Sequence, residues 1–290
     1  MIRFGPAGRD EIFPTIYKSN LDMPYYLAEK GLNAFEYQCG QGVRISETVA
    51  KALGRNAKEH GIQISLHAPY FISLASEDKA KRDNSIGYIL SAAKACNWMG
   101  GERIVVHLGG VGKLSRDKAL LLARETLTEA QKVLDSEKLA SIRICPETMG
   151  KIGQLGSLEE TLSLCDIDDR ILPCIDFGHL NARTNGRCST PEEFGDVLDQ
   201  LENSLGKERA KIFHVHFSKI EYTEKGGEKR HLTFEDTVYG PDFSPLAKLL
   251  AERGMEPTII CESAGTQIAD AAYMKEIYEG YMRGAKDEES

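Results

Sequence analysis

The stretch "KIFHVHFSKI", residues 211–220, contains the pattern from which the rest of the fold can be worked out. It is short, apolar and rich in β-branched residues, as is typical of a strand buried on both faces. It nevertheless carries His214 and His216, which lie two residues apart and therefore point to the same face of a strand. Either both are hydrogen-bonded core histidines, or at least one binds something at the strand end. His214 lies two residues deeper, so we expect it to support His216 from inside the fold.

Short apolar stretches of this kind recur along the chain and alternate with longer amphipathic ones. The predicted strands are 2–5, 34–39, 62–68, 103–109, 142–148, 172–178, 211–217 and 258–263. The predicted helices are 21–30, 46–60, 82–99, 115–134, 157–165, 191–203, 243–253 and 270–283. Eight β–α pairs in strict alternation predict an α/β fold, a single (β/α)8 TIM barrel spanning residues 1–290 with its active site at the C-terminal ends of the strands. We expect an irregular, functional loop over 218–242 and a disordered tail over 284–290.

Composition limits the classes of function. The net charge of −8 excludes a broad basic surface, although a local basic groove remains open. Seven cysteines are scattered along the chain, and Cys145, Cys174 and Cys261 stand inside apolar stretches, which indicates buried, reduced thiols of a cytoplasmic protein. The sequence has no apolar run near 18 residues and no secretory leader pattern at its start, so no membrane partner is expected.

Residues able to bind metals stand at or just beyond the predicted C-terminal ends of the strands. They are His67 in "SLHAPY", His107 in "VVHLGG", Glu147 in "CPETMG", Asp176 and His179 in "CIDFGHLNA", His216, Glu262 in "ICESAG", and His231 in the long loop. One histidine in an apolar stretch is more often a core residue. Together, however, these groups would converge on one rim, where buried ionisable groups are costly unless they are paired or bind metal. Imidazole and carboxylate are the ligands of zinc and related metals, so we predict a metal site.

The motifs "HAPY", "VVHLGG", "ETMG", "CIDFGH" and "ICES", in this order, resemble those of the endonuclease IV family of apurinic/apyrimidinic (AP) endonucleases, which belong to the xylose-isomerase-like TIM barrels. The resemblance covers roughly residues 30–265. It implies a DNA-repair hydrolase that carries three zinc ions and cleaves the phosphodiester 5′ to an abasic site, with Glu147 and Glu262 central to catalysis. It implies that His67, His107 and bridging Glu147 hold the first zinc, that Asp176, His216 and Glu262 complete the second, and that His179 and His231 hold the third.

The sequence departs from the family at the third metal. The family places Asp-x-His on the long loop, whereas this chain has "GEKRHL", with Lys229 where the carboxylate is expected. An ammonium group repels a zinc ion, and the adjacent Glu228 has a different spacing. We therefore expect two zinc ions around Glu147 and leave the third site open, with Mn²⁺ or Mg²⁺ as alternative metals. Lys229 would then contact phosphate or point to solvent.

A second departure concerns DNA recognition. The family inserts an arginine-bearing loop into DNA after its second strand, whereas "YQCGQGVRIS" is short, and Gln38, Gln41 and Arg44 are its polar members. Tyr70 matches the position that family members place against the minor groove. The predicted partner is DNA containing abasic sites, bound by a monomer. The predicted substrate-binding residues are Tyr70, Gln38, Arg44, Lys229 and Arg230.

Two other interpretations remain open at the level of sequence. A sugar isomerase or epimerase of the same superfamily would hold one divalent metal with Glu147, Asp176, His216 and Glu262, all of which are present. A non-enzymatic metal-binding protein could recognise nucleic acid or sugar. The nuclease hypothesis is favoured by the histidines that one metal does not need, namely His67, His107, His179 and His231.

Overall fold

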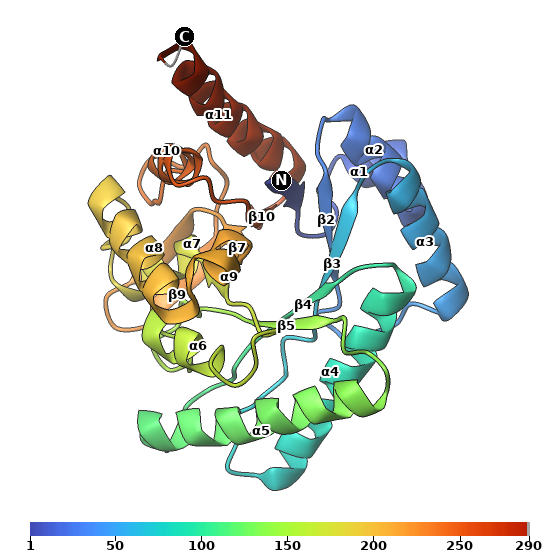
Figure 1. Cartoon of the computed structure of the whole chain (residues 1–290), viewed down its shortest axis with the longest axis vertical. Coiled ribbons are helices and arrows are strands. Elements are labelled where there is room, and N and C mark those ends of the chain that lie inside the picture. Colours follow the sequence, from blue (N-terminus) through green and yellow to red (C-terminus); the bar gives the residue numbers. More distant parts are fainter. Residues whose placement is uncertain (289–290) are drawn as a thin grey trace.

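All eight predicted strands are present in the computed structural model, which describes the backbone of residues 1–288 and the side chains of residues 1–284. The strands lie at the centre and the helices surround them (Figure 1). Several strands, such as β7, are buried at every position, as their apolar sequences predict. The barrel strands are β1 (Arg3–Pro6), β2 (Ala34–Gln38), β3 (Gln63–His67), β4 (Arg103–Val106), β5 (Arg143–Pro146), β6 (Cys174–Asp176), β7 (His214–Phe217) and β10 (Thr258–Cys261).

The strands close into a ring. One parallel sheet has the order β1-β10-β7-β6 and another has the order β2-β3-β4-β5. Two further parallel bridges join the sheets, from Ala7 to Glu36 beside β1 and β2, and from Glu147 to Cys174 beside β5 and β6. A ring of parallel strands, each followed by a covering helix, is a (β/α)8 barrel, so the predicted fold class is confirmed.

Each predicted helix is also present. The sequence signals at their starts are explicit: Ser115 caps α5 by accepting a hydrogen bond from the backbone of Lys118, and Thr190 with Glu193 forms a capping box at α8. None of the described helices is both long and apolar enough to span a bilayer. The helices that match predictions are α2 (Met23–Glu29), α3 (Glu47–Glu59), α4 (Lys79–Trp98), α5 (Arg116–Ser136), α6 (Leu158–Leu164), α8 (Pro191–Leu205), α10 (Ser244–Glu252) and α11 (Gln267–Glu288).

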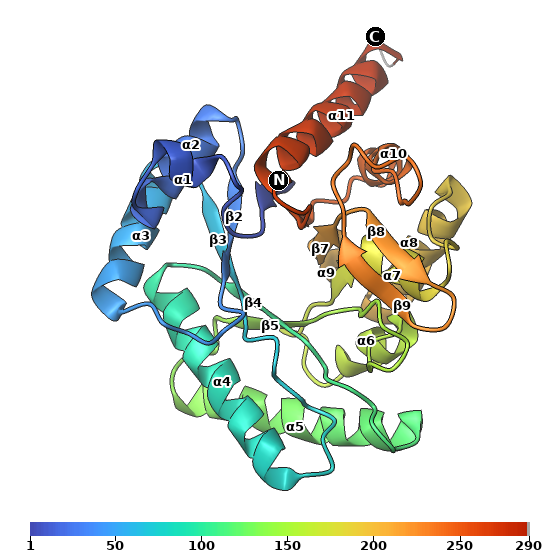
Figure 2. The same ribbon diagram turned by 180° about the vertical axis from the view of Figure 1, so that it is seen from behind.

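Some short elements were not predicted. The sixth strand ends at Asp176 rather than at 178, because the Asp176 side chain accepts the backbone N–H of His179 and so starts a helix. The prediction of an irregular loop over 218–242 is wrong in part, since two antiparallel strands form within it and stand beside β7 and α7 (Figure 2). The unpredicted elements are α1 (Phe13–Ile16), the 3-10 helix η1 (Asn20–Asp22), α7 (Phe177–Arg183), α9 (Lys207–Lys211), β8 (Ile220–Thr223) and β9 (Gly227–His231).

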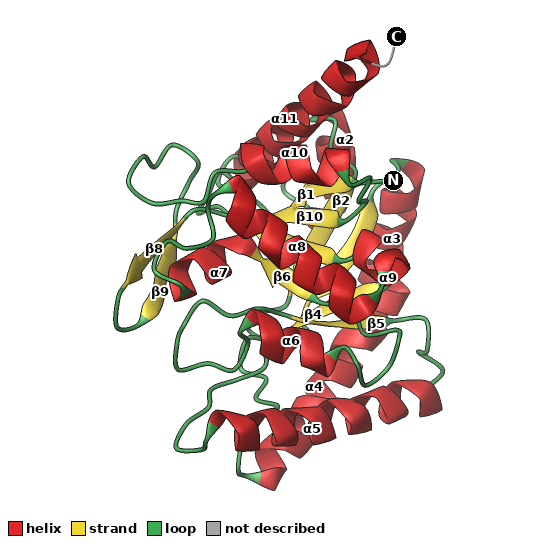
Figure 3. Cartoon of the chain, turned by 60° about the vertical axis from the view of Figure 1, so that its left-hand side comes forward, coloured by secondary structure: helices red, strands yellow, loops and turns green. Residues whose placement is uncertain are grey.

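The expected tail is also corrected. Helix α11 continues through residues 284–288, where Ala, Lys and Glu favour helix, so this part of the predicted tail is helical. Residues 289–290 lie outside the described part of the chain. In Figure 3 the hairpin of β8 and β9 projects from one end of the barrel, and the N-terminus lies toward the other. The hairpin end is the end that carries the predicted site.

Candidate metal centre

Glu147 is the centre of the site. It follows β5, is fully buried, and its two carboxylate oxygens face four imidazoles. Oε2 lies 3.0 Å from Nε2 of His107 and 3.3 Å from Nε2 of His67. Oε1 lies 3.1 Å from Nδ1 of His216 and 3.3 Å from Nδ1 of His179. Residues at the ends of β3, β4, β5 and β7 therefore meet around one carboxylate, as the strand-end pattern predicted.

A second group shares Glu147. Possible ligand atoms of Glu147, Asp176, His216 and Glu262 all lie within 4.8 Å of one another. Nδ1 of His216 is 3.4 Å from Oε1 of Glu262. Oδ1 of Asp176 accepts the backbone N–H of His179, whereas its Oδ2 is buried and has no hydrogen-bond partner within the described chain. A buried carboxylate oxygen without a donor is a group that a cation would satisfy.

A third group lies under the hairpin. His179, Glu228 and His231 offer ligand atoms within 4.8 Å of one another, and Oε2 of Glu228 is 3.5 Å from Nε2 of His179. Lys229 lies outside this group and pairs with Glu221 at 2.5 Å. The carboxylate at this position is therefore supplied by Glu228, and Lys229 is turned toward solvent.

A β-bulge explains how Glu228 replaces the expected Asp-x-His pattern. In the hairpin, Arg230 pairs with Glu221 but Glu228 pairs with Tyr222, so Lys229 is an extra residue on β9. One extra residue reverses the alternation of side chains beyond it. Glu228 and His231, which would point to opposite faces of a regular strand, thus share one face. The spacing E-x-x-H therefore places a carboxylate and an imidazole side by side here.

Close backbone contacts hold the hairpin over His179. The backbone N–H of Glu228 donates to the carbonyl of Gly150 at 3.1 Å, and that of Ile152 donates to the carbonyl of Gly226 at 3.2 Å. A Cβ atom on Gly150 would lie only 2.6 Å from Cβ of Glu228 and 2.9 Å from Cδ2 of His179. Gly150 is required because no side chain fits between the loop after β5 and the hairpin.

Backbone carbonyls orient two of the histidines. Nδ1 of His67 is 2.8 Å from the carbonyl oxygen of Ala68, and Nδ1 of His179 is 3.0 Å from that of Thr148. A carbonyl oxygen only accepts, so each Nδ1 carries the hydrogen. In the neutral ring the Nε2 lone pair then faces carboxylate oxygens, an unfavourable arrangement unless a proton or a metal ion lies between them. Metal-binding histidines are typically oriented in this way.

The pKa values indicate how much positive charge the site requires. Burial by itself would lower the pKa of His67, but its hydrogen bond and charge interaction with Glu147 raise the pKa to about 9. Burial opposes charge on His179 as well, yet Asp176 and Glu147 raise its pKa to about 10. Burial raises the pKa of Asp176, whereas at Glu147 burial is outweighed by His216 and His107 and the pKa falls well below its usual range. Protons balance these carboxylates in the metal-free protein, and metal binding would release them.

The predicted DNA contacts lie at different places. Tyr70 is 53% exposed, and its hydroxyl accepts a hydrogen bond from Gln41 at 3.1 Å. Arg44 is exposed and lines a separate pocket together with Arg9 and Lys18. Tyr70 is thus exposed in the loop that follows β3, whereas Arg44 belongs to a separate pocket.

The remaining predicted contacts have partners within the chain. Arg230 pairs with Glu221 at 2.6 Å, so Glu221 is shared by both basic residues of β9. Gln38 donates to Oε1 of Glu36 at 3.3 Å. Glu36 itself was not predicted as a site residue, because one acidic residue inside an amphipathic strand pattern gives no signal of what it contacts.

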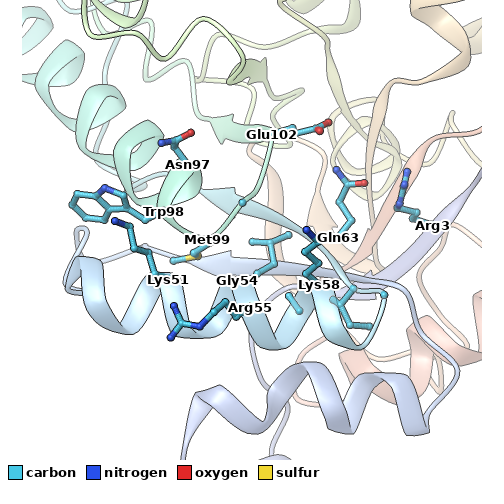
Figure 4. Close-up of a pocket in the computed structure, with 15 residues that line it drawn as sticks. Arg3, Lys51, Gly54, Arg55, Lys58, Gln63, Asn97, Trp98, Met99 and Glu102 are labelled. Atoms are coloured by element: carbon cyan, nitrogen blue, oxygen red, sulfur yellow. The ribbon is translucent and has the colours of Figure 1, made fainter.

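A surface pocket of about 610 Å³ lies at the other end of the barrel (Figure 4). Lys51, Arg55 and Lys58 of α3 line it, along with residues at the starts of strands such as Arg3 and Gln63. This end of a TIM barrel generally serves stability rather than chemistry. The ligand groups around Glu147 are at the opposite end, where the residues that follow the strands converge.

The fold and the ligand groups define the chain as a TIM barrel of the α/β class with a cluster of residues suited to metal binding. A family model described as xylose isomerase-like TIM barrel matches residues 24–280, and the chain belongs to this family. Over 267 residues it is 36% identical to the uncharacterized protein MJ0133 of Methanocaldococcus jannaschii, covering 91% of this chain and 92% of that protein. Over 243 residues it is 30% identical to a probable endonuclease 4 of Oceanobacillus iheyensis, covering 76% and 78%. The crystal structure of a D-tagatose 3-epimerase-like protein matches all of both chains with a TM-score of 0.72 at 22% identity, a likeness of fold.

Proposed function

We propose that this protein is a metal-dependent phosphodiesterase of the endonuclease IV type, which cleaves DNA 5′ to abasic sites. The observation that carries the proposal is the set of ligands beyond the four that one metal needs. His67 and His107 face one oxygen of Glu147, and His179, Glu228 and His231 form a separate group. Three adjacent groups suit a substrate with several negatively charged oxygens better than they suit a neutral sugar.

The donor set fits divalent metal ions, zinc first among them, because it consists of imidazoles and carboxylates held in fixed orientations. His67, His107 and Glu147 would hold one ion, and Glu147, Asp176, His216 and Glu262 would hold another. His179, Glu228 and His231 would hold a third. Such ions, when bound, neutralise phosphate charge and lower the pKa of water so that a nucleophile exists at neutral pH.

The chain's own residues supply orientation and exclusion of water. Glu147 shares its two oxygens between neighbouring groups and, being fully buried, keeps the ligand cluster in a site of low dielectric. Glu262 stands at the partly exposed edge of the cluster, where it can accept a proton from an attacking water. The carbonyls of Ala68 and Thr148 fix the rings of His67 and His179, so these ligands need little reorganisation during the reaction.

Side chains at the rim of the barrel would recognise the DNA. Tyr70, exposed in the loop after β3, offers an aromatic ring that can lie against an unpaired or widened step of the duplex. Lys219 is mostly buried, and its ammonium donates to the carbonyl of Asp236 and pairs with Asp242 in the segment that follows the hairpin. Phosphate contacts by basic side chains would make binding strongly dependent on salt.

A second candidate is a sugar epimerase with one metal. It is favoured by the completeness of the group formed by Glu147, Asp176, His216 and Glu262, and by the pairing of Lys229 and Arg230 with Glu221, which removes two cations from phosphate binding. Glu147 and Glu262 would then act on a single carbon of the sugar, one carboxylate removing its proton from one face and the other returning a proton to the opposite face. The likeness of fold to an epimerase-like protein is consistent with either activity.

The two candidates are separated by metal content and by substrate. Purified protein is analysed for bound metals and is then assayed on a duplex with one abasic analogue, on the matched intact duplex, and on free ketoses. We expect more than one metal per chain, cleavage restricted to the abasic duplex, and binding that weakens with salt at a slope of about −0.9 per phosphate contact. One metal, no cleavage and epimerisation of a ketose would favour the second candidate.

A matched pair of variants sharpens the assay. His231→Asn removes a ligand of the third group, and we expect one metal fewer and a loss of cleavage of about 10²-fold, comparable to losing one group that stabilises charge in a transition state. His60→Asn alters a histidine outside the ligand groups, at the C-terminal end of α3, and should leave the metal content and the cleavage rate unchanged. Equal effects of the two substitutions would contradict the assignment.

A further inference from the structure

Beneath the metal centre, Glu36 of β2 is fully buried inside the barrel. Its Oε2 accepts a hydrogen bond from Oγ of Ser65 at 2.9 Å and lies 2.9 Å from Nε2 of His214. Its Oε1 lies 3.0 Å from Nε2 of His216 and 3.3 Å from Nε2 of Gln38. A carboxylate without exposure is costly in a barrel interior unless it has partners of this kind.

The two oxygens face different neighbours. Ser65 and His214 meet Oε2, whereas His216 meets Oε1 at a short distance, although its N–H is not aligned as a linear hydrogen bond. His214 has no contact with Glu147 among the described ion pairs, so it links to the metal centre only through Glu36 and its neighbour His216. His214 and His216, the two histidines of β7, thus share one buried carboxylate.

The orientation of His216 matters for the metal centre. With Nε2 toward Glu36, the ring directs Nδ1 at Glu147 and Glu262, at 3.1 and 3.4 Å. Both ring nitrogens of His216 face carboxylates, and a neutral imidazole has only one N–H. A metal ion held by Glu147, Asp176 and Glu262 would take the lone pair of Nδ1, which leaves the hydrogen on Nε2, toward Glu36. His216 therefore presents Nδ1, in contrast to His67, which presents Nε2.

We propose that Glu36 is a positioning residue that selects the Nε2–H form of His216 and holds its Nδ1 toward the metal centre. The inference rests on the metal site of the proposed function but not on DNA as the substrate. The carboxylate of Glu36 offers one oxygen to each histidine, Oε2 to His214 and Oε1 to His216. An amide has a single acceptor oxygen, so in Glu36→Gln one of the two rings must face an N–H group and lose its fixed orientation.

Two measurements on the whole protein test this role. Zinc affinity is measured by competition with a chelating dye, and the hydrogen-bearing nitrogen of His216 is identified by long-range ¹H–¹⁵N correlation spectra, with His216→Asn for assignment. In Glu36→Gln we expect zinc affinity at the weakened site to fall by about 10–100-fold, the range for removing a residue that orients a metal ligand. We also expect the single Nε2–H form of His216 to give way to a mixture of both forms.

Ser65→Ala is the matched control, because Ser65 contacts only the oxygen of Glu36 that faces away from His216. It should weaken zinc binding less than threefold and keep the Nε2–H form. Wild-type zinc affinity and an unchanged His216 spectrum in Glu36→Gln would overturn the inference while the proposed function stands. A wild-type protein that bound no zinc would overturn both the proposed function and this inference, so the two failures can be told apart.

Discussion

Replacing Gly150 with alanine should selectively disable the group formed by His179, Glu228 and His231. The added methyl carbon would lie 2.6 Å from Cβ of Glu228 and 2.9 Å from Cδ2 of His179. Ordinary contact begins near 3.4 Å, so Glu228 must withdraw by about 0.8 Å. A metal site tolerates ligand displacements of only about 0.2 Å.

The size of the effect follows from this mismatch. Forcing a methyl group into a filled contact costs about 1–3 kcal/mol of unfolding free energy, so the thermal midpoint of the metal-free protein should fall by roughly 2–12 °C. The loss of binding free energy at the third metal site should be larger than this loss of stability. The substitution disturbs the backbone hydrogen bond between Gly150 and Glu228 and the ligand geometry together. We expect one metal per chain to be lost while those around Glu147 remain.

The assay is metal counting after dialysis, with Gly153→Ala as the control. Gly153 lies in the same loop, and a Cβ there would meet nothing within 4 Å. Retention of every metal in Gly150→Ala, with an unchanged thermal midpoint, would refute the argument that close approach at Gly150 places Glu228 over His179. Loss of metal in Gly153→Ala would show that an added side chain disturbs this loop even where it does not contact Glu228.

Other predictions concern charge. Glu147→Gln should lower turnover at least 10³-fold with the fold intact, because an amide cannot offer two anionic oxygens to neighbouring cations; circular dichroism and turnover measure this. Glu228→Gln should remove one metal, whereas Lys229→Ala should not, and metal analysis of both variants would expose an error if their losses were equal. The pKa of His67 is raised to about 9 and that of His179 to about 10, so their contribution to the stability of metal-free protein is complete below pH 6.5 and is lost as pH rises through 9 to 10. Thermal midpoints should therefore fall across that range only without metal, and a midpoint that rises with pH would contradict the assigned charges.

The sequence by itself determined the barrel and most of the imidazoles and carboxylates that meet at its rim. Short apolar stretches alternating with amphipathic ones predict parallel strands and covering helices. A strand buried on both faces is apolar throughout, whereas a helix buried on one face is apolar at every third or fourth residue. Since parallel strands end at the same rim, residues such as His67, Glu147 and Glu262 could be grouped before their distances were known.

Only the tertiary structure decided which carboxylates complete the centre. Glu228 reaches His231 because a bulge at Lys229 reverses the alternation on β9, and a bulge is set by pairing with β8 and docking on Gly150 rather than by local propensity. Glu36 lies in a strand whose pattern looks ordinary, yet closure of the barrel brings it within 3.0 Å of a histidine that is 180 residues later in the chain. Periodicity reports which face a residue occupies, whereas partners across a closed barrel depend on register and closure, which local sequence does not encode.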